Sequence, residues 1–264
     1  MSIFCTSLPI LLCYLSHDLC SFYTYMCTRS TRCSSRPHLR HPAVCVSARA
    51  ALSLLAVDTA RAAGPSPEIV PLPASFPSRY GVPVLSAVDV AIFGGRYFTH
   101  CMQCSFCRDA CCSEGVDVDL LHLHALEAHA DGLEARTGVP RDRWFTQQRS
   151  YDPEMPGGGS VRTQVVDGAC VFRDRRGRGC LVHAYCLERG LDYHTLKPLV
   201  DCLFPLTFSE GILCPADEAE DGTLICLDTG PTFYRGVREE LGYYFGEGLL
   251  RALDALEGGV PNPS

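Results

Sequence analysis

The sequence predicts an α+β fold that is small and irregular, with short antiparallel strands and flanking helices. Short apolar segments separated by glycine and proline turns predict the strands. Leucines at helical spacing after residue 116 and again after residue 231 predict the helices. Five cysteines within residues 101–112 form the third observation. Because thiolates this dense bind metals, we expect the domain to be metal-stabilised.

Composition excludes several classes of function. The chain has 264 residues, 47% hydrophobic and 20% charged, which is typical of a globular protein, and no apolar run reaches the 18 residues of a membrane span. The net charge of -7 argues against nucleic acid as a partner. Seventeen cysteines, an odd number in a long chain, favour a reducing compartment over a disulfide framework, so we expect a cytoplasmic protein.

Residues 1–65 differ from the rest and are treated as an N-terminal extension. They contain six arginines but only two acids, Asp18 and Asp58. No basic residue precedes Arg29, which argues against a secretory signal. The composition resembles an organellar transit peptide, and the alternative is a start codon assigned too far upstream.

The remaining chain is divided into three ranges. Residues 66–100 contain a proline-rich linker up to Pro83 and a leading strand over Val84–Val90. Residues 101–228 form the cysteine-cluster domain, and residues 229–264 form C-terminal helices packed on it.

Within the cysteine-cluster range, a helix is predicted over Val116–Arg136, capped by Asp117 or Asp119 and ended by Gly138. Its histidines, His122, His124 and His129, lack the i, i+4 spacing of a zinc-binding pair, so solvated or core-edge roles are favoured.

Turn signals predict the other elements. Asp167-Gly168 predicts a hairpin, and the arginine-rich turn 175–179 favours a solvated tip over an anion site. Further predicted elements are a core anchor at Trp144, a flexible loop over 156–160, a helix over 184–189, a hairpin over 204–214, a strand over 223–227, and a helix from Pro231 that breaks at Gly246–Gly248.

The spacing Cys101-x2-Cys104-x2-Cys107-x3-Cys111 matches the bacterial ferredoxin run, with Cys112 where that pattern has proline. A two-cluster ferredoxin needs a second run, which the sequence lacks. One [4Fe-4S] cluster completed by a distant cysteine remains open.

The later cysteines extend the pattern: Cys170-Val-Phe, Gly179-Cys180-Leu-Val-His183, and Lys197-Pro198 followed by Cys202-Leu-Phe-Pro205. With the central run, this resembles the YkgJ-like cysteine-cluster family of zinc- or iron-chelating domains, especially its longer DUF3109-like relatives. The sequence departs from that pattern where Arg108-Asp109-Ala110 separates Cys107 from the vicinal pair, and Cys101 is additional.

The resemblance implies seven metal ligands, and Cys101 joins them on spacing; the set is Cys101, Cys104, Cys107, Cys111, Cys112, Cys170, Cys180 and Cys202. Cys186, Cys214 and Cys226 lie beside leucine or isoleucine and are assigned to the core. His183 is expected to support a ligand rather than to be one, and Lys197 is either a surface residue or a charge-balancing one.

Two functions follow. The first is a structural or regulatory module in which zinc or iron ties irregular segments together and an unidentified protein partner is bound. The second is an iron–sulfur protein in electron transfer or redox chemistry. No catalytic constellation is recognisable, although similar clusters occur in lysine-N-methylase-like proteins, so enzymatic activity is left open.

Overall fold

The computed structural model describes residues 68–98, 106–220, 222 and 224–259, which belong to one unit, Ala63–Ser264. The predicted N-terminal extension and two predicted ligands, Cys101 and Cys104, lie outside the described residues. The described chain contains helices together with antiparallel and parallel strand pairs, which confirms the α+β class. None of its helices has the length and apolarity needed to span a bilayer.

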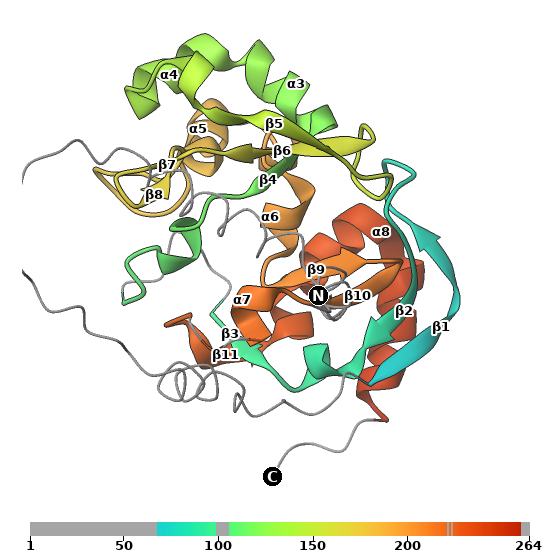
Figure 1. Ribbon diagram of the computed structural model, residues 1–264. Coiled ribbons are helices and arrows are strands. Elements are labelled where there is room, and N and C mark those ends of the chain that lie inside the picture. Colours follow the sequence, from blue (N-terminus) through green and yellow to red (C-terminus); the bar gives the residue numbers. More distant parts are fainter. Residues whose placement is uncertain (1–67, 99–105, 221, 223, 260–264) are drawn as a thin grey trace, which may run out of the picture. The chain divides into compact units, whose positions relative to one another are not determined.

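A four-stranded sheet has the order β1-β2-β10-β9 (Figure 1). Its strands are β1 Ile69–Pro77, β2 Val84–Asp89, β9 Leu206–Ser209 and β10 Ile212–Pro215. β2 and β10 pair in parallel, and the other neighbours are antiparallel. The interpretation of the proline-rich stretch as a linker is wrong for β1, because an edge strand tolerates residues that cannot donate to a ladder.

Helix α8, Phe233–Glu257, packs against this sheet and against the 3-10 turn η1, Val90–Phe93. Thr232 caps its start by accepting a hydrogen bond from Arg235 N. The predicted break is confirmed at Gly246, whose φ of 79° and ψ of 174° are not helical. Together these elements bury the first core cluster, which includes Leu85, Tyr234, Leu241 and Leu249.

A second sheet, in the order β4-β6-β5, carries a separate core cluster. Its strands are β4 Asp117–Asp119, β5 Phe145–Tyr151 and β6 Gly159–Thr163, so residues 159–160 of the predicted flexible loop are strand. Trp144, 2% exposed, is the predicted core anchor. It packs edge-on against Phe172, with ring centroids 5.2 Å apart.

The predicted helix over Val116–Arg136 is two helices, α3 Leu120–Ala128 and α4 Ala130–Thr137. Residues 117–119 pair with β6 instead of joining the helix, because sheet pairing overrides local propensity. Asp119 is the N-cap and accepts a hydrogen bond from His122 N, as predicted for one of two aspartates. Gly138 ends α4 in the left-handed conformation, which glycine adopts at low cost.

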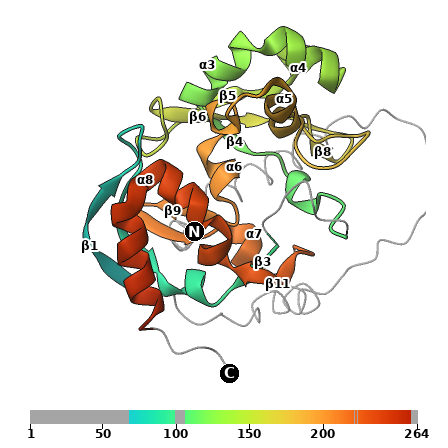
Figure 2. The same cartoon turned by 180° about the vertical axis from the view of Figure 1, so that it is seen from behind.

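The segment after β6 joins the two clusters. It contains β7 Val165–Val166, β8 Ala169–Cys170, α5 Leu181–Arg189, the 3-10 turn η4 Tyr193–Thr195 and α6 Leu199–Leu203. Figures 1 and 2 both show α6 between the group α3, α4 and α5 and the group α8, β9 and β10. The remaining elements are η2 Ala110–Cys112, η3 Arg141–Arg143, α7 Asp217–Glu220, and the pair β3 Arg96–Tyr97 and β11 Leu227–Thr232.

A cysteine-lined cavity as the candidate functional site

A cavity of about 1040 Å³ lies where residues of the two core clusters meet. All the predicted ligands that the structure describes line it: Cys107, Cys111, Cys112, Cys170, Cys180 and Cys202. Cys107 and Cys202 belong to the first cluster and Cys170 to the second. The fold therefore brings to one cavity thiols that are far apart in sequence.

Each thiol is positioned by a short element. Cys111 and Cys112 lie in η2, where Cys112 N donates to Asp109 O. Cys170 ends β8, and Cys180 stands at the N-cap of α5. Cys202 lies in α6, which Pro198 introduces at its N-cap position. Because these elements are too short to be stable alone, their positions depend on the surrounding packing.

The vicinal pair has asymmetric electrostatics. A hydrogen bond from the Cys112 thiol lowers the pKa of Cys111, although burial opposes this effect. The same hydrogen bond, together with burial, raises the pKa of Cys112. Cys111 is therefore the thiol of the pair that is easier to ionise, and a thiolate is the form that binds a soft metal.

Three further thiols, Cys170, Cys180 and Cys202, are held neutral by burial. Burial raises the pKa of Cys170 and of Cys180, and it raises the pKa of Cys202 to about 12 against the opposing charge of Lys197. Lys197 is 7% exposed, and its Nζ donates to Asp201 O over 3.0 Å. The surface interpretation of Lys197 is wrong, because the residue is buried and lines the same cavity as the thiols.

Three cysteines were predicted to lie in the core, and the structure shows that two of them do not line the cavity and that the third does. Cys186 is fully buried in the second cluster, and Cys214 lies in β10; neither lines the cavity. Cys226, 3% exposed, does line it. The assignment of Cys226 to the core alone was incomplete, since it packs in the first cluster and also faces the cavity.

His183 lines the cavity from α5 and carries a buried nitrogen, Nδ1, without a hydrogen-bond partner. Its ring stacks on Tyr193 with centroids 4.4 Å apart. Burial, helped by the positive charge of Lys197, lowers its pKa, so the imidazole is neutral at pH 7. A neutral imidazole with an unsatisfied nitrogen can support or join a thiolate site.

The described donors suit a metal in chemical type but do not form a finished site. Thiols and a neutral imidazole are ligands for zinc and for iron–sulfur clusters. Among residues 68–98, 106–220, 222 and 224–259, however, no three His, Cys, Asp or Glu side chains are grouped closely enough to hold one ion. The donors line a shared cavity without converging on one point.

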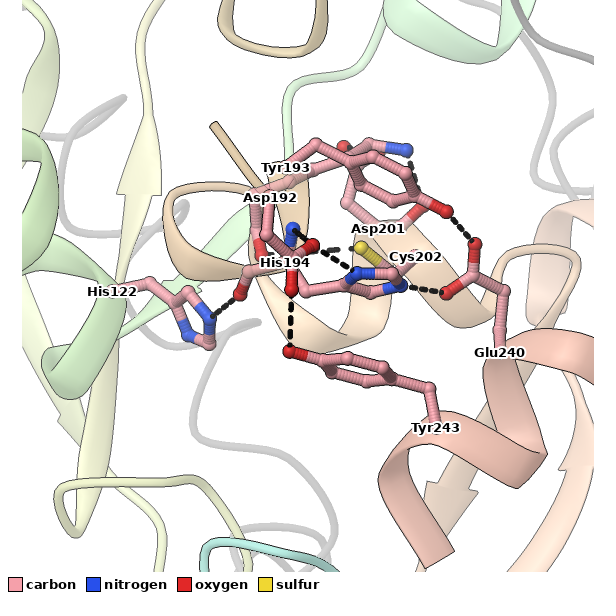
Figure 3. Close-up of polar contacts among 9 residues, drawn as sticks. His122, Asp192, Tyr193, His194, Asp201, Cys202, Glu240 and Tyr243 are labelled. Atoms are coloured by element: carbon pink, nitrogen blue, oxygen red, sulfur yellow. Dashed lines mark hydrogen bonds and ion pairs between the residues drawn. The ribbon is translucent and has the colours of Figure 1, made fainter. Parts of the chain in front are cut away.

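A polar network borders the cavity and joins η4 to α8 (Figure 3). His194 Nδ1 lies 2.5 Å from Asp192 Oδ1, and Nε2 lies 2.7 Å from Glu240 Oε2. Tyr193 donates to Glu240 over 2.5 Å, and Tyr243 donates to Asp192 over 3.0 Å. Both nitrogens of His194 face carboxylates, so the ring is held as an imidazolium.

Burial alone lowers the pKa of His194, but the hydrogen bonds with Glu240 and Asp192 outweigh it and the pKa is raised. The same hydrogen bonds outweigh the effect of burial on the two carboxyl groups, whose pKa values are lowered. His194 O also accepts from His122 Nε2 over 3.0 Å. The network thus connects α3, η4 and α8 around the segment that leads to Cys202.

A second polar contact corrects the interpretation of the arginine-rich turn. Arg175 pairs with Asp167 at the tip, as expected of a solvated hairpin. Arg178 instead lies against Asp109 and Cys107, 3.1 Å from the carboxylate Oδ1 and 3.6 Å from the sulfur. The two arginines of one turn therefore have different surroundings.

Sequence reasoning missed Asp109, Asp192 and Glu240 as residues that shape the site. Their partners are distant in the chain, and aspartate and glutamate are common surface residues. The one available signal was the spacer Arg108-Asp109-Ala110 next to predicted ligands, which differs from the YkgJ-like pattern that the sequence resembles.

No family model matches the chain, and neither a curated protein nor a solved structure matches it. The resemblance to the YkgJ-like pattern therefore rests on the motif residues themselves.

Proposed function

We propose that the protein is a metal-binding cysteine-cluster protein that holds zinc or iron in the cavity between its two core clusters. The observation that carries the proposal is that every described predicted ligand lines this one cavity. Cysteines that were merely buried would not need to share a cavity; Cys186, for example, is buried in the second cluster and does not line the cavity.

The chemistry of the donors supports the same proposal. Cys111, Cys112, Cys170, Cys180 and Cys202 are reduced thiols, which fits the reducing, cytoplasmic setting that we propose. Binding would deprotonate thiols whose pKa values are raised by burial, so metal and proton compete for the same sulfur atoms. Because the described donors are not grouped around one point, we infer that metal binding draws them together and couples ligation to the final ordering of the cavity.

Within this proposal the role is structural or regulatory, with a protein partner, and the family is the YkgJ-like one with its DUF3109-like relatives. The alternative is an iron–sulfur cluster in electron transfer, which the ferredoxin-like spacing ending at Cys107 and Cys111 favours. A cluster absorbs visible light and bleaches on reduction, whereas zinc is colourless, so one preparation separates the two.

Metal analysis of anaerobically purified protein tests the proposal. We expect stoichiometric zinc or iron; in the second case, a broad visible absorption that dithionite bleaches would identify a cluster. Protein that contains neither metal, and that takes up neither zinc nor ferrous iron with sulfide after reduction, contradicts metal binding.

Substitution of single cysteines assigns the ligands. We expect Cys202→Ser to lose most of the metal, because a serine hydroxyl is a poor ligand for a soft ion. Cys214→Ser is the matched control. Cys214 is a partly buried thiol in strand β10, and its side chain does not line the cavity. Equal metal content in both variants would contradict the assignment.

A further inference from the structure

We propose that Asp109 is a positioning residue: with Arg173 and Arg178 it forms an ionic latch that assembles the two sides of the cysteine-lined cavity before metal binds. The inference rests on the proposed function for its effect on metal binding. The latch itself is a property of the metal-free protein. It connects the segment carrying Cys107, Cys111 and Cys112 to the segment between Cys170 and Cys180.

The carboxylate of Asp109 is buried, with 3% of the side chain exposed, between two guanidinium groups. Arg178 Nε donates to Oδ1 over 3.1 Å, and Arg178 Nη2 lies 3.1 Å from the same oxygen. Arg173 Nε lies 3.7 Å from Oδ2. A buried carboxylate needs such partners, because losing one leaves an uncompensated charge away from water.

The same arginines hold other atoms of the 107–109 segment. Arg173 Nη2 donates to Arg108 O over 3.0 Å, and Arg178 Nη2 donates to Cys107 Sγ over 3.6 Å. Arg178 therefore contacts a carboxylate and a predicted ligand sulfur with one guanidinium group. Its planar fork of donors makes this double contact, which a lysine ammonium cannot reproduce in the same geometry.

The backbone at residues 108–109 directs the Asp109 carboxylate to the arginines and not to a neighbouring amide group. Arg108 and Asp109 both adopt left-handed φ values, 53° and 58°, which residues other than glycine rarely adopt. Asp109 occupies the N-cap position of η2, yet its side chain makes no capping hydrogen bond. The carboxylate is directed to the arginines instead, and the tight turn places Cys107 and the vicinal pair on the same cavity.

The latch also gives a role to the spacer, residues 108–110, that separates Cys107 from Cys111. This spacer supplies a buried acid, Asp109, that reaches across to the arginine-bearing loop. The contacts of Asp109 with Arg173 and Arg178 hold the two cysteine-bearing segments next to each other.

Asp109→Asn tests the latch, because asparagine has the same size and tolerates the left-handed conformation while removing only the charge. Asp167→Asn is the matched control. Asp167 also has a left-handed φ, 48°, and pairs with an arginine of the same loop at 2.7 Å, but its side chain is 80% exposed. Both variants are compared with the parent protein, metal-free and reduced, by hydrogen exchange with mass spectrometry.

We expect Asp109→Asn to raise amide exchange in residues 106–112 and 170–181 while α8 stays protected, and Asp167→Asn to leave both segments unchanged. On reloading with zinc, Asp109→Asn should bind roughly 10- to 100-fold more weakly, the range seen when a residue that orients a ligand is lost. Unchanged exchange in Asp109→Asn overturns the latch.

Arg178→Lys and Arg178→Gln keep the proposal testable if Asp109→Asn fails to fold, because Arg178 is partly exposed. Both should open residues 106–112 to exchange, the lysine variant less than the glutamine variant. Parent-like exchange in Arg178→Gln overturns the latch. If the parent protein binds no metal while the exchange results hold, the latch stands and the proposed function fails.

Discussion

The two core clusters differ in how they are held, and the cavity lies where they meet. The first is built by α8 on a four-stranded sheet and contains long apolar side chains such as Leu241 and Leu249. The second is built from short strands and short helices around Trp144. Residues of both clusters line the cavity together with polar groups, among them the thiols, Arg173 of the Asp109 latch and Glu240 of the His194 network.

The clusters and the region around the cavity are therefore stabilised by different kinds of interaction. Apolar burial stabilises a region without specifying fine geometry, whereas hydrogen-bonded charges fix positions and contribute less net stability. We therefore expect the two clusters to be stabilised separately. The junction, by which we mean the cavity and the polar network of His194 beside it, should depend on polar contacts and, under the proposed function, on metal.

The largest expected effect comes from removing a buried leucine from either cluster. Leu133→Ala in α4 and Leu241→Ala in α8 should each cost about 2–5 kcal/mol, because both side chains are fully buried. Trp144, the only tryptophan of the chain, reports on the second cluster. In metal-free protein its fluorescence midpoint in urea should fall more for Leu133→Ala than for Leu241→Ala.

Exposed Leu187 supplies the control for both variants, and Leu187→Ala should change the free energy of unfolding by no more than about 0.5 kcal/mol. If fluorescence and circular dichroism shift together by the same amount in Leu133→Ala and Leu241→Ala, the clusters unfold as one unit and the comparison fails.

A smaller, pH-dependent effect is expected at the junction. Because the pKa of His194 is raised in the folded protein, its contribution is full below about 6.5 and is lost as pH rises through the folded value. The pKa values of Glu240 and Asp192 are lowered, so their contribution is lost as pH falls through their folded values. The network should therefore stabilise most between about pH 4.5 and pH 6.5.

His194→Gln should cost about 1–3 kcal/mol at pH 6, since hydrogen bonds to charged groups are lost, and less at pH 9. Urea unfolding at a series of pH values measures this. His124→Gln is the control, because His124 is exposed and lies outside the network. A His194→Gln deficit that does not shrink from pH 6 to pH 9 would count against an imidazolium bridge.

The smallest expected effect concerns the start of α8. Thr232→Ala removes the hydroxyl that accepts from Arg235 N over 3.2 Å and should cost about 1 kcal/mol. Thr232→Ser keeps the hydroxyl and should remain near the parent. Because Thr232 does not line the cavity, chelation should not change the Thr232→Ala deficit. A larger deficit after chelation would show that the start of α8 depends on the metal.

Elements specified by local chemistry were predicted from the sequence. The Asp167-Gly168 turn, the helix end at Gly138 and the break at Gly246 each depend on a residue that tolerates positive φ, and the structure confirms all three. Residues 117–119 were misassigned because their strand partner, residues 160–162, is distant in the chain. Residues 69–77 pair with the next strand along the chain, and they were misassigned because their prolines are typical of a linker.

The candidate site was likewise predicted where its signal is local in the sequence, and it was missed where the partners are distant. Thiol spacing indicated which cysteines belong together, and the described ones share a cavity. Cys226 was missed because its neighbours, Ile225 and Leu227, are those of a core cysteine. Asp109 and Arg178 are 69 residues apart, and no local pattern connects an acid to an arginine over that distance.

Lys197 provides a unique side-chain amine at the cavity. It is the only lysine in the chain, all other basic side chains of the 23 being arginines, and it lies at the cavity wall with 7% of its surface exposed. An amine-directed reagent therefore has one side-chain target, and that target borders the thiols. Because the side chain is buried, only a reagent small enough to enter the cavity would acylate it, and such a reagent would place a label beside the thiols without any engineered residue.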